Sequence, residues 1–141
     1  MKRTVWMLTL TLVVGIAIGI MGTHVLNAQY AQQEAVKRTT LLKVDLAGIE
    51  GKEVRMRLTE IAPGATSPKH YHPGQVFGYI VAGSMLFEAE GQPPVTRAAG
   101  EAFHEPPKQV HSAKNASQTV PVKILAFAIA ERGQPDTIPV K

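Results

Sequence analysis

The sequence contains no cysteine, and this absence removes several kinds of chemistry at once. Thiol catalysis, zinc–thiolate sites and attachment of a lipid to an N-terminal cysteine are all excluded. Small domains outside the cytoplasm often rely on disulfides for stability. If this chain is exported, its folded part must therefore be held together by core packing or by a metal ion.

Aromatic side chains and excess charge of one sign are also scarce. Aromatic residues make up 6% of the chain, the formal net charge is only +4, and the basic residues do not form a cluster. Binding of nucleic acid needs a basic patch, and binding of single strands also needs aromatic side chains on which bases can stack. The composition therefore argues against a nucleic-acid partner.

A long uncharged segment does occur, at the N-terminus. Lys2 and Arg3 precede a stretch without charge from Thr4 to Gln33, whose apolar core covers residues 5–26. A positive start followed by an apolar core is typical of an export signal, and about 20 apolar residues can also span a bilayer. The segment therefore predicts either a signal peptide, cleaved after Ala28, or an uncleaved hydrophobic anchor helix.

These alternatives set the expected organisation of the chain. Four segments follow one another: 1–28 as signal peptide or N-terminal membrane anchor, 29–40 as linker, 41–132 as the single folded domain, and 133–141 as C-terminal tail. Because positive charges before an apolar segment stay in the cytoplasm, the domain is expected on the other side. It is either periplasmic or anchored to the inner membrane, which it touches only through residues 5–26 if these are not cleaved.

Beyond the linker, short strand patterns alternate with turns rich in glycine and proline. In one of them Arg55 and Arg57 alternate with Val54, Met56 and Leu58. Alternation of this kind predicts that the apolar face is buried and that the arginines lie in solvent. Roughly eight to ten short strands at regular spacing predict an all-β barrel or sandwich.

Two histidines in one short segment are the strongest functional signal. His70 and His72 lie between Gly64 and the Pro73-Gly74 turn, and side chains two residues apart on a strand point to the same side. His111, on a second strand, could close a face of three imidazole nitrogens. Because neutral imidazole is the commonest ligand of divalent transition metals, this pattern predicts a metal site. The alternative for a histidine pair alone is two unrelated surface residues beside a turn.

The stretch from Gly64 to Asn115 resembles the two sequence motifs of the cupin superfamily. The first motif, G-x5-H-x-H-x3/4-E-x6-G, is matched by Gly64, His70, His72 and Gly83. The second, G-x5-P-x-G-x2-H-x3-N, is matched by Gly100, Pro106, His111 and Asn115, with Lys108 in place of a glycine. The resemblance implies an all-β, single cupin jelly-roll β-barrel behind the N-terminal export or anchor helix.

One position departs from the family pattern. The first motif has a glutamate where this chain has Val76, which cannot bind a metal. Typical cupins use this glutamate and three histidines to hold iron, manganese, nickel or zinc. The resemblance therefore implies a three-histidine site for one divalent ion. Gln75 is a possible substitute ligand, but it reaches the ion only if the preceding turn shifts the register of the strand.

Other polar residues near the motifs receive weaker assignments. His104 is a candidate catalytic acid or base, or a further ligand, and the alternative is a half-buried residue without chemistry. Asn115 is expected to tie a turn through its amide rather than to touch the ion. The glutamates that do not stand at the acid position of the first motif are expected to face solvent: Glu88, Glu90, Glu101 and Glu105.

Two functions stay open for such a site. The first is an exported metal-dependent oxidoreductase of the dioxygenase type, in which one Fe, Mn, Ni or Zn ion binds a small chelating organic substrate. The resemblance to three-histidine cupin dioxygenases implies this class. The second is a non-enzymatic module that binds a small ligand or metal, since a fold does not imply catalysis. Cupins commonly pair through sheet edges, so a homodimer through residues 41–46 is also predicted.

Overall fold

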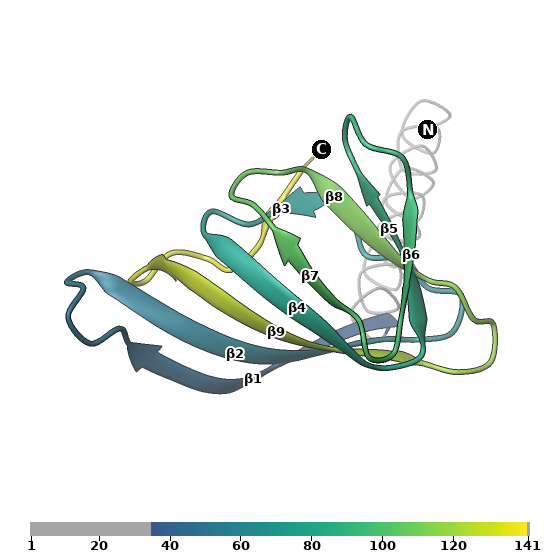
Figure 1. The fold of residues 1–141 in the computed structure, drawn as a ribbon, viewed down its shortest axis with the longest axis horizontal. Helices are drawn as coiled ribbons and strands as arrows, with labels where there is room; N and C mark the ends of the chain where they lie inside the picture. The colour runs from purple at the N-terminus through teal and green to yellow at the C-terminus, as the bar shows by residue number, and fades with distance from the viewer. Residues whose placement is uncertain (1–34, 141) are drawn as a thin grey trace, which may run out of the picture. The chain divides into compact units, whose positions relative to one another are not determined.

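The computed structural model of this protein describes residues 35–140. The predicted signal or anchor, residues 1–28, and the linker as far as residue 34 lie outside this range. Within it the chain forms ten strands, and every pairing between them is antiparallel (Figure 1). None of the helices in the described part of the chain is long and apolar enough to cross a membrane.

The strands make two five-stranded sheets. The first has the order β1 (Val36–Asp45), β2 (Lys52–Ile61), β9 (Val122–Glu131), β4 (Gln75–Ala82) and β7 (Ala102–Glu105). The second has the order β10 (Ile138–Pro139), β3 (His70–Tyr71), β8 (His111–Asn115), β5 (Ser84–Ala89) and β6 (Val95–Ala98). Two antiparallel sheets built from strands distant in sequence confirm the predicted all-β fold for the described residues.

Two element boundaries differ from the predicted ones. Strand β1 begins at Val36, inside the segment assigned to the linker, and Val36 lies opposite Ile61 of β2. The segment assigned to the tail supplies β10, in which Ile138 pairs with Tyr71. The start of β1 is polar and β10 is short, and both are strands because their backbones pair with a neighbouring strand. Alternation of hydrophobic residues does not predict such pairing.

Strand β2 turns its charged side inward, so the predicted orientation of this strand is wrong. Arg55 and Arg57 are buried together with Glu53, whereas Val54, Met56 and Leu58 are only partly covered. The charges are tolerated because they are paired: Arg55 Nε donates to Glu53 Oε1 at 2.6 Å, and Arg55 Nη1 donates to Asp136 Oδ1 at 2.5 Å. Buried charges need such partners.

The main apolar core joins the two sheets. Its buried residues come from β1, β2, β4 and β9 of the first sheet and from β5 of the second: Val36, Ile61, Ile80, Met85, Phe87, Ala89, Val122 and Ile124. Asn115 connects the end of β2 to the segment before β9, because its Nδ2 donates to the carbonyl oxygens of Ile61, Ala62 and Val120. The amide therefore has the turn-tying role predicted from the sequence.

The turn before β8 explains why the second motif has a glycine where this chain has Lys108. The φ angle of Lys108 is 63°, in the left-handed region that favours glycine. This conformation accompanies a bond from the Lys108 N–H to the carbonyl oxygen of His72, at 2.8 Å. The turn thus connects the segment of the first histidine pair to the strand of the third histidine.

Replacing Lys108 with glycine is expected to raise the free energy of unfolding by about 1 kcal/mol, because it removes the steric cost of a left-handed side chain. The neighbouring Gln109→Gly change is the control. Gln109 has no left-handed φ, so there glycine only adds chain entropy and is expected to destabilise. Urea denaturation of the wild type and the two variants measures the free energy of unfolding. An equal loss of stability in Lys108→Gly and Gln109→Gly would contradict the explanation.

Candidate metal centre

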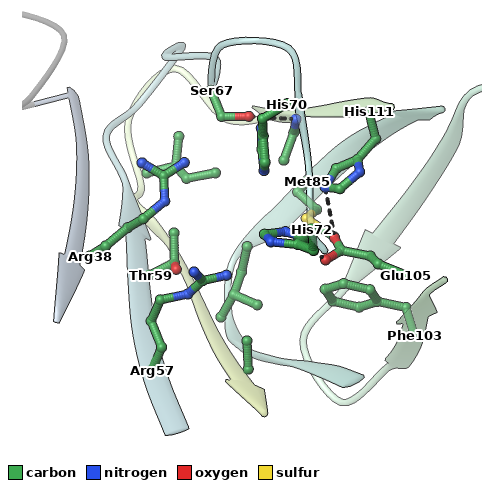
Figure 2. A pocket seen from close by; sticks show the side chains of 14 residues that line it. Arg38, Arg57, Thr59, Ser67, His70, His72, Met85, Phe103, Glu105 and His111 are labelled. Carbon is green, nitrogen blue, oxygen red and sulfur yellow. Dashed lines mark hydrogen bonds and ion pairs between the residues drawn. The ribbon is translucent and has the colours of Figure 1, made fainter. Parts of the chain in front are cut away.

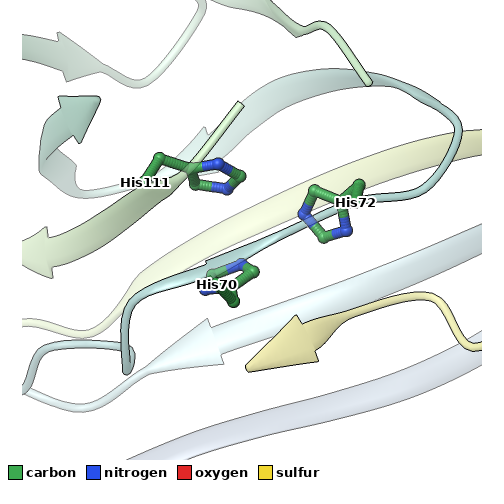
Figure 3. A group of neighbouring side chains, drawn as sticks. All are labelled: His70, His72 and His111. Atoms are coloured by element: carbon green, nitrogen blue, oxygen red, sulfur yellow. The ribbon is translucent and has the colours of Figure 1, made fainter. Parts of the chain in front are cut away.

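Three histidines from neighbouring segments of the second sheet point into one pocket (Figure 2). His70 begins β3, His72 directly follows this strand, and His111 begins β8 opposite His70. All three are buried. One ring nitrogen from each ring lies within 4.8 Å of the other two (Figure 3). The three histidines predicted to share a site thus form a cluster that could hold a metal ion.

Backbone carbonyl groups determine which ring nitrogen is free in each histidine. Every Nδ1 is bonded to a carbonyl oxygen: His70 to Pro68 at 2.7 Å, His72 to Asp136 at 2.5 Å and His111 to Gln109 at 2.8 Å. A carbonyl oxygen can only accept, so each Nδ1 carries a proton. A neutral ring then presents the lone pair of Nε2 to the pocket, which is how metal-ligating histidines are commonly held.

A buried glutamate lies against two of these nitrogens. Glu105, the last residue of β7, is 7% exposed. Its carboxylate oxygens lie 3.2 Å from His72 Nε2 and 3.3 Å from His111 Nε2 (Figure 2). The prediction that Glu105 faces solvent is therefore wrong. In the pairing of β4 with β7, Glu105 stands directly opposite Val76, the position where the first motif has its glutamate.

The charge of this carboxylate depends on two opposing effects. Burial by itself would raise the pKa of Glu105, whereas the contact with His72 and the positive charge that the rings of His111, His72 and His70 carry when protonated lower it, and the net pKa lies below the usual value. Glu105 is therefore ionised at neutral pH. The site combines three imidazole nitrogens with one negative charge.

A divalent transition metal fits this donor set. A lone pair facing a carboxylate is a favourable contact only if a proton or a cation lies between the two atoms. Burial lowers the pKa of His70 to about 4 and also lowers that of His111, so these rings resist protonation. One ion between the three histidines would, in contrast, satisfy their lone pairs, and Glu105 lies beside two of these nitrogens. Ligands about 2.1 Å from one ion lie about 3.0–3.4 Å apart, which matches the separations of Glu105 from the two nitrogens.

The two remaining predicted site residues lie away from the cluster. Gln75 and His104 are exposed and are joined to each other, with Oε1 of Gln75 2.5 Å from Nε2 of His104. Val76 is buried inside the barrel, so its neighbour Gln75 points outward, and no shift of register brings it to the ion. This placement corrects both assignments, and neither residue belongs to the proposed site.

A sequence model described as "Cupin domain" matches residues 57–128, just over half of the chain. The matched range includes the three histidines and Glu105. This chain belongs to the cupin family. No protein of curated function matches the sequence of this cupin.

Solved structures similar to this cupin have low sequence identity and share its fold. DMSP lyase DddQ from Ruegeria pomeroyi is 18% identical with a TM-score of 0.62, and the match covers 75% of this chain and 52% of the lyase. KdgF from Halomonas sp. is 21% identical with a TM-score of 0.54, covering 67% and 79%. A cupin-2 domain from Rhodospirillum rubrum is 17% identical with a TM-score of 0.59, covering 76% and 66%. This chain thus spans about half the length of the lyase.

The metal-free protein is expected to lose stability as the pH falls from about 6.5 to about 4. The unfolded chain binds a proton at His70 near pH 6.5, whereas the folded protein does so only near pH 4. The unfolded state therefore holds more protons in this window, and the free energy of unfolding falls by about 2.5 kcal/mol between neutral pH and pH 4.5. Urea denaturation in the presence of a chelator measures it. A His70→Gln variant should show a shallower pH dependence; an unchanged dependence would contradict the assignment.

Proposed function

We propose that this protein is a metal-dependent oxidoreductase of the dioxygenase type that acts on a small chelating organic substrate. One divalent iron, manganese, nickel or zinc ion would be held by His70, His72, His111 and Glu105. The observation that carries the proposal is the cluster of three buried histidine rings, with the carboxylate of Glu105 against the Nε2 atoms of two of them. Zinc has no redox chemistry, so a dioxygenase activity would belong to the iron, manganese or nickel form.

The lining of the pocket favours a reaction that needs little proton transfer by the protein. Apart from the four proposed ligands, the charged groups among its described lining residues are Arg38 and Arg57, and guanidinium groups stay protonated. Thr59 and Ser67 offer hydroxyls, which are weak nucleophiles and bases without an activating partner. The bound metal would act as a Lewis acid and as a binding position for dioxygen.

The size and walls of the pocket limit what can react there. The cavity has a volume of about 40 Å³ and is bounded in part by Met85, Phe103 and Ile124. This is room for a few water-sized groups beside the ligands. The substrate would therefore be small, or would insert only its reactive end, and the apolar walls would keep further water away from it.

Oxygen uptake by the metal-loaded protein tests the proposal. Protein loaded separately with iron, manganese or nickel is mixed with 2-hydroxy acids, 2-oxo acids, β-diketones and catechols, and dioxygen is followed with an electrode. We expect uptake with at least one class of chelating compound, and none from protein treated with a chelator. Tight binding of such a compound without uptake by any metal form would contradict the oxidoreductase.

Tight binding of a chelating compound without oxygen uptake would favour a non-enzymatic binding module. The shortage of free acid and base groups in the pocket is the observation that supports this alternative. A binding module would take up its ligand or its metal with one-to-one stoichiometry and return it unchanged, which mass spectrometry of the recovered ligand would show.

We also propose that the domain works outside the cytoplasm. The positive and then apolar segment at residues 1–28 supports an export signal or an inner-membrane anchor. An alkaline phosphatase fusion after residue 40 is expected to be active. Fractionation of the full chain into soluble periplasm and membrane distinguishes cleavage from anchoring.

The predicted homodimer through residues 41–46 is likewise a proposal. It is supported by the position of β1 at the edge of the first sheet and by the exposure of Leu41, Leu42 and Val44 on that strand. An edge strand with apolar side chains is prone to pair with another chain. A monomeric mass by light scattering would contradict this arrangement.

A further inference from the structure

Two arginines from the first sheet enter the pocket beside the histidine cluster. Arg57 of β2 and Arg38 of β1 both line the pocket, and Figure 2 shows their guanidinium groups on the side of the pocket that faces His70 and His72. Arg57 is only 8% exposed, whereas Arg38 lies on the exposed edge strand. One guanidinium is thus set deep in the pocket and the other stands nearer to its edge.

The hydrogen-bonding capacity of Arg57 is largely unused. Its Nε is buried without a hydrogen-bond partner, and its Nη1 lies 3.5 Å from Asp136 Oδ2, at the limit of a hydrogen bond. Asp136 is engaged more closely by Arg55, at 2.5 Å. A buried donor without a partner costs about 1–3 kcal/mol, so a guanidinium left in this state indicates a place for an acceptor that the protein itself does not supply.

Among the side chains that line the pocket, positive charge is in excess, although Asp136 lies 3.5 Å from Arg57 outside this lining. Burial and then the charge of Arg57 lower the pKa of Arg38, and the charge of Glu105 raises it. Glu105 is the one acid among the described lining residues, and it faces the histidines. A bound divalent ion would increase the excess further. A partly enclosed pocket of one charge sign attracts ligands of the opposite sign.

We propose that Arg38 and Arg57 bind the carboxylate of the substrate while a hydroxyl or carbonyl oxygen of the same molecule reaches the metal. This inference rests on the proposed metal site and narrows the substrate to small hydroxy or oxo acids. The planar guanidinium group matches a carboxylate because two N–H groups can donate side by side to its two oxygens. The hydroxyl of Thr59, on the same inward face of β2, is a further donor beside Arg57.

Binding to the zinc-loaded full chain tests the proposal without turnover. The probes are glycolate and glycolamide, which have the same size and the same hydroxyl but differ in charge. Isothermal titration calorimetry is expected to show at least tenfold tighter binding of glycolate to the wild type. This preference is expected to disappear in Arg57→Gln and to decrease in Arg38→Gln. Arg57→Lys keeps the charge but not the paired donors, so its preference for glycolate is expected to lie between that of the wild type and that of Arg57→Gln.

A matched control is Arg132→Gln. Arg132 is exposed and paired with Asp45 at 2.9 Å outside the pocket, so its loss changes the net charge equally without touching the proposed site. Its glycolate affinity is expected to equal that of the wild type. If Arg57→Gln does not fold, Arg38→Gln on the exposed edge strand still decides the question.

Zinc content, measured on the same samples, separates the two proposals. If every variant holds one equivalent of zinc and glycolate binds all of them equally, the carboxylate site is wrong and the metal site stands. If the wild type holds no zinc, the metal site fails and this inference fails with it. Inorganic phosphate is the third probe: binding of phosphate but not of glycolate, with the same dependence on arginine, would overturn the carboxylate assignment.

Discussion

The full chain is expected to hold about one equivalent of a transition metal, and His111→Ala is expected to bind that metal about a thousandfold more weakly, a loss of about 4 kcal/mol. His111 supplies one of the four proposed donor atoms from the strand opposite His70. Removing its ring leaves an incomplete donor set and a vacant position beside Glu105. Because structural metal sites contribute strongly to folding, the variant should also lose most of the rise in Tm that the metal gives the wild type.

His104→Ala is the matched control for this measurement. It also removes an imidazole ring, but His104 is exposed on β7 of the first sheet and is hydrogen-bonded to Gln75. Its metal content and its Tm with metal are expected to equal those of the wild type. Elemental analysis and competition with a chelator give both quantities. Equal metal loss in the two variants, or a wild type that rejects iron, manganese, nickel and zinc, would contradict the site.

The parts of the fold that follow from local rules could be predicted from the sequence. His70 and His72 share a side because strand side chains alternate, and the glycine and proline turns separate the strands at the right places. The two motifs place His111 in the same cluster. The shared side of the histidine pair and the turns depend on short-range spacing, whereas the place of His111 is implied by the resemblance to the cupin motifs; the structure brings all three histidines together.

The parts that depend on register between distant strands could not be predicted. Glu105 lies 29 positions after Val76 in the chain, and no alternation within either strand shows that the two are opposite each other in β4 and β7. The orientation of β2 has a similar cause. Alternation shows that Arg57 and Met56 face different sides of the sheet. Which of the two sides faces inward depends on ion pairs with the segment just before β10, such as that of Arg55 with Asp136.

Replacing Glu105 with glutamine is expected to weaken metal binding about a hundredfold, or by about 2.7 kcal/mol. The change keeps the size of the side chain and removes its negative charge from a buried site that holds three imidazole rings. In Glu105→Gln a bound metal ion would lose its one anionic ligand, and its positive charge would no longer be compensated inside the buried site. Glu90→Gln, at an exposed position, is the control and is expected to leave affinity unchanged.

Moving the acid back to the position of the family motif is the sharper form of the same test. Val76 and Glu105 are opposite each other in an antiparallel pair and both are buried, so their Cβ atoms are about 4.5–5.5 Å apart on one face. The double variant Val76→Glu/Glu105→Val is therefore expected to recover most of the affinity that Glu105→Gln loses. Wild-type affinity in Glu105→Gln would show that the carboxylate is not a ligand. Recovery in the double variant would show that the site requires a carboxylate at this point, and that either of two neighbouring strands can supply it.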